Sequence, residues 1–152
     1  MSVLKSKRNE SKVEFIKVAG EIFTRTVAFV SRMSARYGRL IASDTVHLAS
    51  EVLAHAEKAN AIYPSDDERR RLRTEHLLEA RASLMALDVH LSQVYAVLVM
   101  NPEGAFERAS KKPVEKYDAE RRLQNMAQTL GELIDQEDKL LTGVLKNSKK
   151  RE

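Results

Sequence analysis

The side chains best suited to chemistry in this sequence are four arginines placed at helical spacing. Arg25, Arg32, Arg36 and Arg39 follow one another at intervals of seven, four and three residues. At about 100° per residue, these intervals put all four on one face of a continuous helix. The guanidinium group is planar and donates from a rigid fork that matches phosphate oxygens. The pattern predicts a stripe that binds a nucleic-acid backbone, and the alternative is a solvated helix face without a ligand.

Three further basic clusters accompany this stripe: one near residue 8, one directly after Asp66–Glu68, and one at Lys149–Arg151. The acids before the second cluster are placed to pair with its arginines and to favour a helix N-terminus, so that cluster ranks below the stripe. The sequence contains no base-reading motif, so we expect binding to depend on backbone charge and shape. The candidate nucleic-acid-binding residues are Lys7, Arg8, Lys12, Arg25, Arg32, Arg36, Arg39, Arg69, Arg70 and Arg73.

A second candidate chemistry is metal binding. His47, Glu51 and His55 lie four residues apart, which places them on one side of a helix and resembles ligand spacing. A di-iron bundle would also need several inward carboxylates and Glu-x-x-His pairs on two helices, and neither is present. His76 and His90 can share a helix face, but nothing else in the sequence converges on them. We therefore expect no metal and no cofactor, with His47 and His55 as surface or boundary residues.

Catalysis by a nucleophile or by acid–base groups lacks its usual residues here. The chain has no Cys, no Gly-x-Ser-x-Gly turn and no glycine-rich phosphate loop. Glu137 and Asp138 interrupt an apolar stripe, where carboxylates paired with a neighbouring helix are the simplest interpretation and a general base is the alternative. We expect no catalytic residues and a protein that is not an enzyme.

The composition indicates a helical protein. A chain of 152 residues with 43% hydrophobic residues can form one domain with a buried core, and three Pro and five Gly are too few for a many-stranded sheet. The net charge of +4 is unevenly distributed, since residues 1–40 contain nine Lys or Arg and only three Glu. Such a local excess favours phosphates or another acidic partner. No secretory signal and no membrane-spanning apolar run is present, so we expect a cytoplasmic protein.

Caps and apolar periodicity predict two helices in the first half of the chain. The first begins at the capping box Ser11–Glu14 and ends at Gly38, which is placed as a C-cap. The second begins near Ser43 or Asp44, and the stretch Asn60–Pro64 stops it because the residue before a proline avoids helical geometry.

The last two helices carry the clearest periodicity. The third begins at a second capping box, Ser65–Glu68, and ends at Asn101–Gly104. A polar loop to Lys112 leads to the fourth, with Pro113 in its first turn and Gly131 inside it as a sign of close backbone approach. The third helix has a heptad seam at Leu77, Ala80, Leu84, Leu87, Leu91, Val94 and Leu98. The fourth has apolar positions at Leu123, Met126, Leu130, Leu133, Ile134, Leu140, Leu141 and Val144.

Four amphipathic helices joined by short connections predict an all-α, antiparallel four-helix bundle. We expect a single domain over residues 1–152, with frayed tails at 1–10 and 147–152. The third helix, of about 35 residues, would extend past the second, of about 19, and leave apolar surface for another subunit to cover. The sequence therefore predicts a homo-oligomer.

Several short stretches resemble one known family. Lys5–Ser11, Arg36-Tyr37 followed later by Ala59–Pro64, and Glu137–Gly143 are similar to the accessory variability determinant (Avd) proteins of diversity-generating retroelements. The wider group of small bacterial four-helix bundles includes proteins encoded within intervening sequences of 23S ribosomal RNA genes. The resemblance covers most of residues 5–100 and the C-terminal part of the chain.

The resemblance implies an accessory subunit without catalytic activity. In this family the bundle assembles into a positively charged pentameric barrel that binds a reverse transcriptase and its template RNA. By resemblance, the arginines from Arg25 to Arg39 become candidates for contact with RNA or polymerase. Residues Asn101–Lys112 depart from the family pattern as an insertion between the last two helices. The competing hypothesis is an adaptor or scaffold bundle that acts through protein contacts only.

Overall fold

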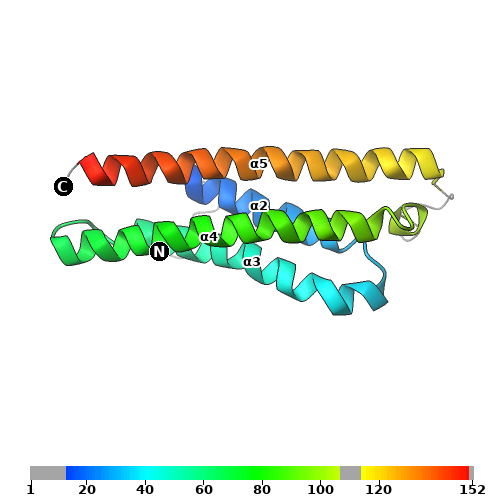
Figure 1. The fold of residues 1–152 in the computed structure, drawn as a ribbon, viewed down its shortest axis with the longest axis horizontal. Helices are drawn as coiled ribbons and strands as arrows, with labels where there is room; N and C mark the ends of the chain where they lie inside the picture. Colours follow the sequence, from blue (N-terminus) through cyan, green and yellow to red (C-terminus); the bar gives the residue numbers. More distant parts are fainter. Residues whose placement is uncertain (1–12, 107–113, 151–152) are drawn as a thin grey trace, which may run out of the picture.

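Four long helices form the protein in the computed structural model, which describes residues 13–106 and 114–150, the last three as backbone only. They are α2 (Glu14–Val30), α3 (Ala35–Ala61), α4 (Asp67–Leu98) and α5 (Lys116–Lys150), with a short 3₁₀ helix η1 (Glu103–Phe106) after α4. The helices run alternately up and down, and each packs against two neighbours (Figure 1). The predicted all-α antiparallel four-helix bundle is confirmed. None of the helices in the described ranges is long and apolar enough to cross a membrane.

One apolar core runs along the bundle between the four helices. Every residue of the predicted heptad seam of α4 is buried, from Leu77 to Leu98. On α5 the buried positions include Leu123, Leu130 and Leu141, which were predicted from the same helical period. Burial of these side chains supplies most of the driving force for folding, because apolar area removed from water contributes about 25 cal/mol per Å².

A turn separates α2 from α3 where the sequence predicted one continuous helix. The Ser31 hydroxyl donates to a main-chain carbonyl one turn back, at 2.6 Å, and α2 ends there. Ser34 caps α3, because its hydroxyl accepts from the Tyr37 amide at 3.4 Å. Met33, only 9% exposed, holds the turn against the core. Gly38 lies in the first turn of α3 without a positive φ, so the prediction that it ends a helix is wrong.

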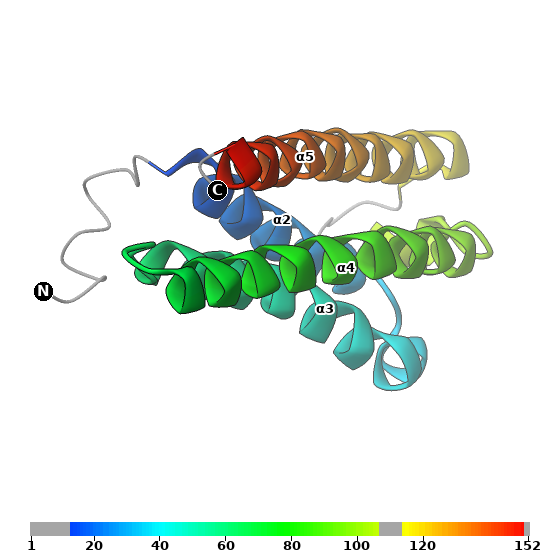
Figure 2. The ribbon, with the colours of Figure 1, turned by 60° about the vertical axis from the view of Figure 1, so that its left-hand side comes forward.

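Helix α3 therefore begins well before its predicted start near Ser43 or Asp44. Residues 35–44 are mainly exposed, and the first buried side chain of α3 is Thr45. Both views show the start of α3 diverging from the other helices (Figures 1 and 2). The apolar period thus marked where the helix meets the core rather than where it begins. With 27 residues in α3 and 32 in α4, the large difference in length that we predicted is wrong.

The helix starts differ from the predicted capping boxes. Ser11 lies outside the described residues, and α2 has Val13 as its N-cap with Glu14 as its first residue, so Glu14 is not the third position of a capping box. The N-cap of α4 is Asp66 rather than Ser65, and its carboxylate accepts from the Arg69 amide at 2.8 Å. The Asp66 carboxylate can replace the serine because it also accepts from a free amide in the first turn of the helix.

The helix α5 differs from the prediction in its extent and in the surroundings of Gly131. The helix α5 begins at Lys116 and extends to Lys150, so its backbone is helical into the predicted tail 147–152, while Pro113 and the tail 1–10 lie outside the described residues. A Cβ atom on Gly131 would meet nothing within 4 Å, so the predicted close backbone approach is wrong. Gly131 instead borders a cavity of about 170 Å³ that also contacts Phe29 and Tyr95.

Candidate nucleic-acid interface

The turn between α2 and α3 distributes the four predicted arginines over three elements. Arg25 lies on α2, Arg32 in the turn, and Arg36 and Arg39 on the first turns of α3. The prediction of a single helical stripe is therefore wrong, because the helix ends at residue 30 and the angular relation between the four positions is lost. Arg32, Arg36 and Arg39 instead lie close together in the chain around one end of the bundle, and Arg25 lies about two turns earlier on an exposed face.

A buried aromatic ring holds two guanidinium groups at this end of the bundle. The carbon at the centre of the Arg32 guanidinium lies 4.8 Å from the centre of the Phe106 ring, and that of Arg122 lies 5.5 Å from it. Phe106, 4% exposed, belongs to η1, so the predicted polar loop after α4 contains a core residue. The ring face attracts both cations without neutralising them. Sequence reasoning missed Arg122, because no local pattern connects it with Arg32.

These cations have no acidic partner in the described part of the chain. No carboxylate there lies within 4.0 Å of a basic nitrogen of Arg25, Arg32, Arg36 or Arg39. Three of the four are exposed and Arg32 is half-buried. Guanidinium groups keep their charge at any accessible pH, so the bundle end presents positive charge that is free to meet phosphate.

A cavity of about 310 Å³ opens beside these arginines. Its walls come from the turn and the start of α3, from the end of α4, and from η1. Arg32, Met33 and Tyr37 line it from the turn and the start of α3, and Met100 and Asn101 line it from the segment just after α4. Gly104 and Ala105 of η1 complete its lining. It combines apolar walls with polar edges, as small-ligand sites do.

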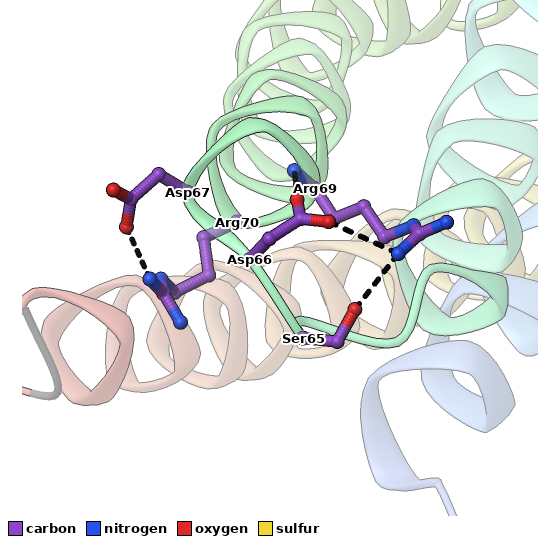
Figure 3. Close-up of polar contacts among 5 residues, drawn as sticks. All are labelled: Ser65, Asp66, Asp67, Arg69 and Arg70. Atoms are coloured by element: carbon purple, nitrogen blue, oxygen red, sulfur yellow. Dashed lines mark hydrogen bonds and ion pairs between the residues drawn. The ribbon is translucent and has the colours of Figure 1, made fainter.

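The arginines at the start of α4 have the opposite environment (Figure 3). Arg69 donates to the Asp66 carboxylate at 3.0 Å and to the Ser65 hydroxyl at 2.9 Å. Arg70 forms an ion pair with Asp67. The prediction that the preceding acids pair with this cluster is confirmed for these two arginines, so a phosphate would have to compete with a carboxylate already beside each of them.

Of the remaining predicted basic residues, only Arg73 has a side chain in the described part of the chain. Arg73 on α4 is half-buried and makes a contact of its own. Lys7, Arg8 and Lys12 lie outside the described residues, as do the side chains of the Lys149–Arg151 cluster.

The histidines come together in a way that sequence spacing did not predict. His55 Nδ1 lies 3.0 Å from His76 Nδ1 of α4, and His55 Nε2 lies 3.1 Å from a carboxylate oxygen of Glu51. His47 is exposed, with its Nε2 3.6 Å from the other Glu51 oxygen. The prediction that nothing converges on His76 is wrong. In residues 13–106 and 114–147, no group of three or more His, Asp or Glu side chains is arranged to hold a metal ion.

The two acids in the middle of α5 have different environments. Asp138 accepts from Arg81 Nε of α4 at 2.9 Å, which confirms the predicted pairing with a neighbouring helix. Glu137 is fully buried, and neither carboxylate oxygen has a hydrogen-bond partner among the described residues, so the predicted pairing is wrong for Glu137. Burial raises the pKa of Glu137 to about 8, because the charged form loses its hydration. Glu137 lines neither the 170 Å³ cavity beside Gly131 nor the 310 Å³ cavity beside the α2–α3 turn.

Comparisons with known proteins identify no relative of this chain: no protein-family model, no curated protein and no solved structure matches it.

Proposed function

We propose that this protein is a non-enzymatic accessory subunit that binds nucleic acid, RNA or cDNA, through the bundle end formed by the α2–α3 turn. The observation that carries the proposal is the group of arginines there without a carboxylate partner among the described residues. Unpaired guanidinium groups are the cations best suited to contact phosphates, and backbone contacts of this kind need no base-reading motif.

The resemblance to Avd proteins gives this proposal its biological setting. In that setting the partner is the reverse transcriptase of a diversity-generating retroelement, the nucleic acid is its template RNA or the cDNA, and the protein acts in the cytoplasm as a homo-oligomer, a pentamer by resemblance. The open reading frames next to the gene provide a direct check. An adjacent reverse transcriptase together with imperfect DNA repeats supports this setting, and their absence removes it while leaving nucleic-acid binding open.

The test of binding is a titration with structured RNA at several salt concentrations. We expect the combined variant Arg32→Ala/Arg36→Ala/Arg39→Ala to lose at least about a hundredfold in affinity at low salt. The slope of log affinity against log salt becomes shallower by roughly one unit for each phosphate contact removed. Circular dichroism verifies that the helices remain, since Arg36 and Arg39 are exposed and Arg32 is only half-buried.

The matched control is Arg69→Ala/Arg70→Ala/Arg71→Ala, which removes the same number of positive charges from the start of α4. We expect this variant to retain most of its affinity, because Arg69 and Arg70 already have acidic partners and Arg71 lies at the end of the bundle opposite the α2–α3 turn (Figure 1). Equal losses in both variants would show that net charge, and not this site, governs binding. If the wild type has affinity for neither RNA nor single-stranded DNA at low salt, nucleic-acid binding is excluded.

A protein-contact role is the second candidate, and the outer face of α4 favours it. Leu78, Met85 and Val89 are 51%, 41% and 59% exposed and recur at helical spacing on the side away from the core. We expect this face to be covered in a homo-oligomer. Light scattering at micromolar concentration measures the mass, and Met85→Glu should lower it. A wild-type mass of 17.2 kDa, that of one chain, would exclude the homo-oligomer.

A further inference from the structure

We propose that the cavity beside the α2–α3 turn binds one unstacked base of a single-stranded nucleic acid. This inference rests on the proposed nucleic-acid function and adds to it the kind of strand that is recognised. Its volume of about 310 Å³ is at the lower end of small-ligand sites, which suits a single planar ring system.

The walls of the cavity provide surfaces for stacking. Tyr37 lines the cavity and remains 42% exposed, so part of its side chain is accessible to a ligand. Met100, 73% exposed, lines the same cavity from the end of α4. Stacking of a base on an aromatic ring accounts for much of the binding of single strands, and it tolerates any sequence because every base has a π-face.

The rim of the cavity provides a directed polar group. Asn101 lines the cavity, and its Oδ1 accepts from the Gly104 amide at 3.4 Å. This contact leaves the Asn101 Nδ2 protons for another acceptor, such as a ring nitrogen or carbonyl of a base. A Cβ atom at Gly104 would lie 2.5 Å from Asn101 Nδ2, so a larger residue there would displace the Asn101 side chain.

The phosphates on either side of the inserted base would meet the unpaired arginines. Arg32 lines the cavity, and Arg36 precedes Tyr37 in the chain and is exposed. A base can enter only if it is free of its pairing partner, because the bases of a duplex are stacked inside it. Proteins that recognise RNA by its bases mostly bind unpaired nucleotides in this way, with an aromatic ring below the base and cations beside the backbone.

The experiment compares the affinities of the full chain for a single-stranded RNA and for a duplex of the same length, at one fixed salt concentration. We expect the single strand to bind at least fivefold more tightly. Tyr37→Ala should reduce the affinity for the single strand between about fivefold and a hundredfold and leave duplex affinity unchanged. Tyr37→Phe, which keeps the ring, should retain wild-type affinity. The cap of α3 survives both changes, because it uses the Tyr37 backbone amide.

The matched control is Tyr63→Ala. Tyr63 is 80% exposed in the α3–α4 connection, at the opposite end of the bundle, so we expect no change in affinity. If Tyr37→Ala binds the single strand as tightly as the wild type does, or if single strand and duplex bind equally, the base-binding cavity is excluded while phosphate binding stands. If the wild type binds neither of the two RNAs and no single-stranded DNA at low salt, the proposed function itself is excluded.

Discussion

The starts of α3 and α4 are two versions of the same local structure with different charge. Each helix begins at a polar N-cap and has arginines in its first turns. In α4 the cap is Asp66 and the first turn contains two acids, Asp67 and Glu68, whereas α3 is capped by the neutral Ser34 and has no acid in its first turn. Acids stabilise a helix N-terminus through the helix dipole, so the arrangement in α4 is the more stable one locally.

The comparison shows that the number of arginines in a cluster does not measure the charge it can offer. Arg69 and Arg70 already have carboxylates beside them, and a phosphate would have to displace these partners. Arg36 and Arg39 have none among the described residues, and Arg32 rests on Phe106, a contact that leaves its charge in place. A neutral cap therefore keeps the α3 arginines available for a ligand.

Glu137 is an acid without a partner among the described residues, like the arginines at the α3 start, but it lies in the core. Its substitution has the largest effect that we expect, a change in the free energy of unfolding. The folded protein keeps the proton of Glu137 up to a pH near 8, whereas an unfolded chain releases it near the ordinary pKa of 4.5. The free energy of unfolding should therefore fall as the pH rises between these values. Replacing Glu137 with Gln removes this dependence and should stabilise the protein at pH 7 by about 3 kcal/mol, at about 1.4 kcal/mol per pH unit.

Urea denaturation of Glu137→Gln and wild type at pH 5, 7 and 8.5 measures this difference, which should be small at pH 5. The adjacent control Asp138→Asn breaks only a partly exposed ion pair with Arg81, so it should cost less than about 1 kcal/mol. A wild type whose stability is flat from pH 5 to 8.5 would contradict the assigned state of Glu137.

A second prediction concerns substitutions that place acids at the start of α3, as they are placed in α4. The double variant Ser34→Asp/Ala35→Asp puts a carboxylate at the N-cap and another four residues before Arg39, so RNA affinity should fall by about tenfold. Helix stability should rise slightly, because both acids favour the helix dipole. RNA titration and thermal unfolding measure the two effects on the same sample. The control Ser50→Asp/Asn60→Asp has the same net charge at exposed positions away from the turn, and an equal loss there would contradict a local effect.

The third and smallest effect comes from the reciprocal change at α4. Asp66→Asn/Asp67→Asn removes the acidic partners of Arg69 and Arg70 while keeping a side chain that caps the helix equally well. We expect a gain in RNA affinity of about threefold and a steeper salt dependence. Glu57→Gln/Glu79→Gln changes the net charge equally on exposed helix faces and serves as the control. If both pairs of substitutions give the same gain, pairing at the α4 start does not limit these arginines.

Features that depend on neighbours within a few residues could be predicted from the sequence. The period of 3.6 residues identified the helical class and the buried seam from Leu77 to Leu98. The acids before Arg69 and Arg70 predicted ion pairs that the structure contains, because residues three apart on a helix start are always close. The helix start predicted near Ser43 or Asp44 is wrong, but it lies next to Thr45, the first buried residue of α3.

Contacts between distant parts of the chain could not be predicted from residue spacing. The turn at Ser31–Ser34 has a polar sequence that a continuous helix also tolerates, and burial of Met33 together with the cap at Ser34 favours the turn. Arg32 and Arg122 share the Phe106 ring only because α2, η1 and α5 end or begin at the same place. The candidate site therefore could not be read from spacing, since it is formed where helices end, and helix ends are positioned by the packing of the whole bundle.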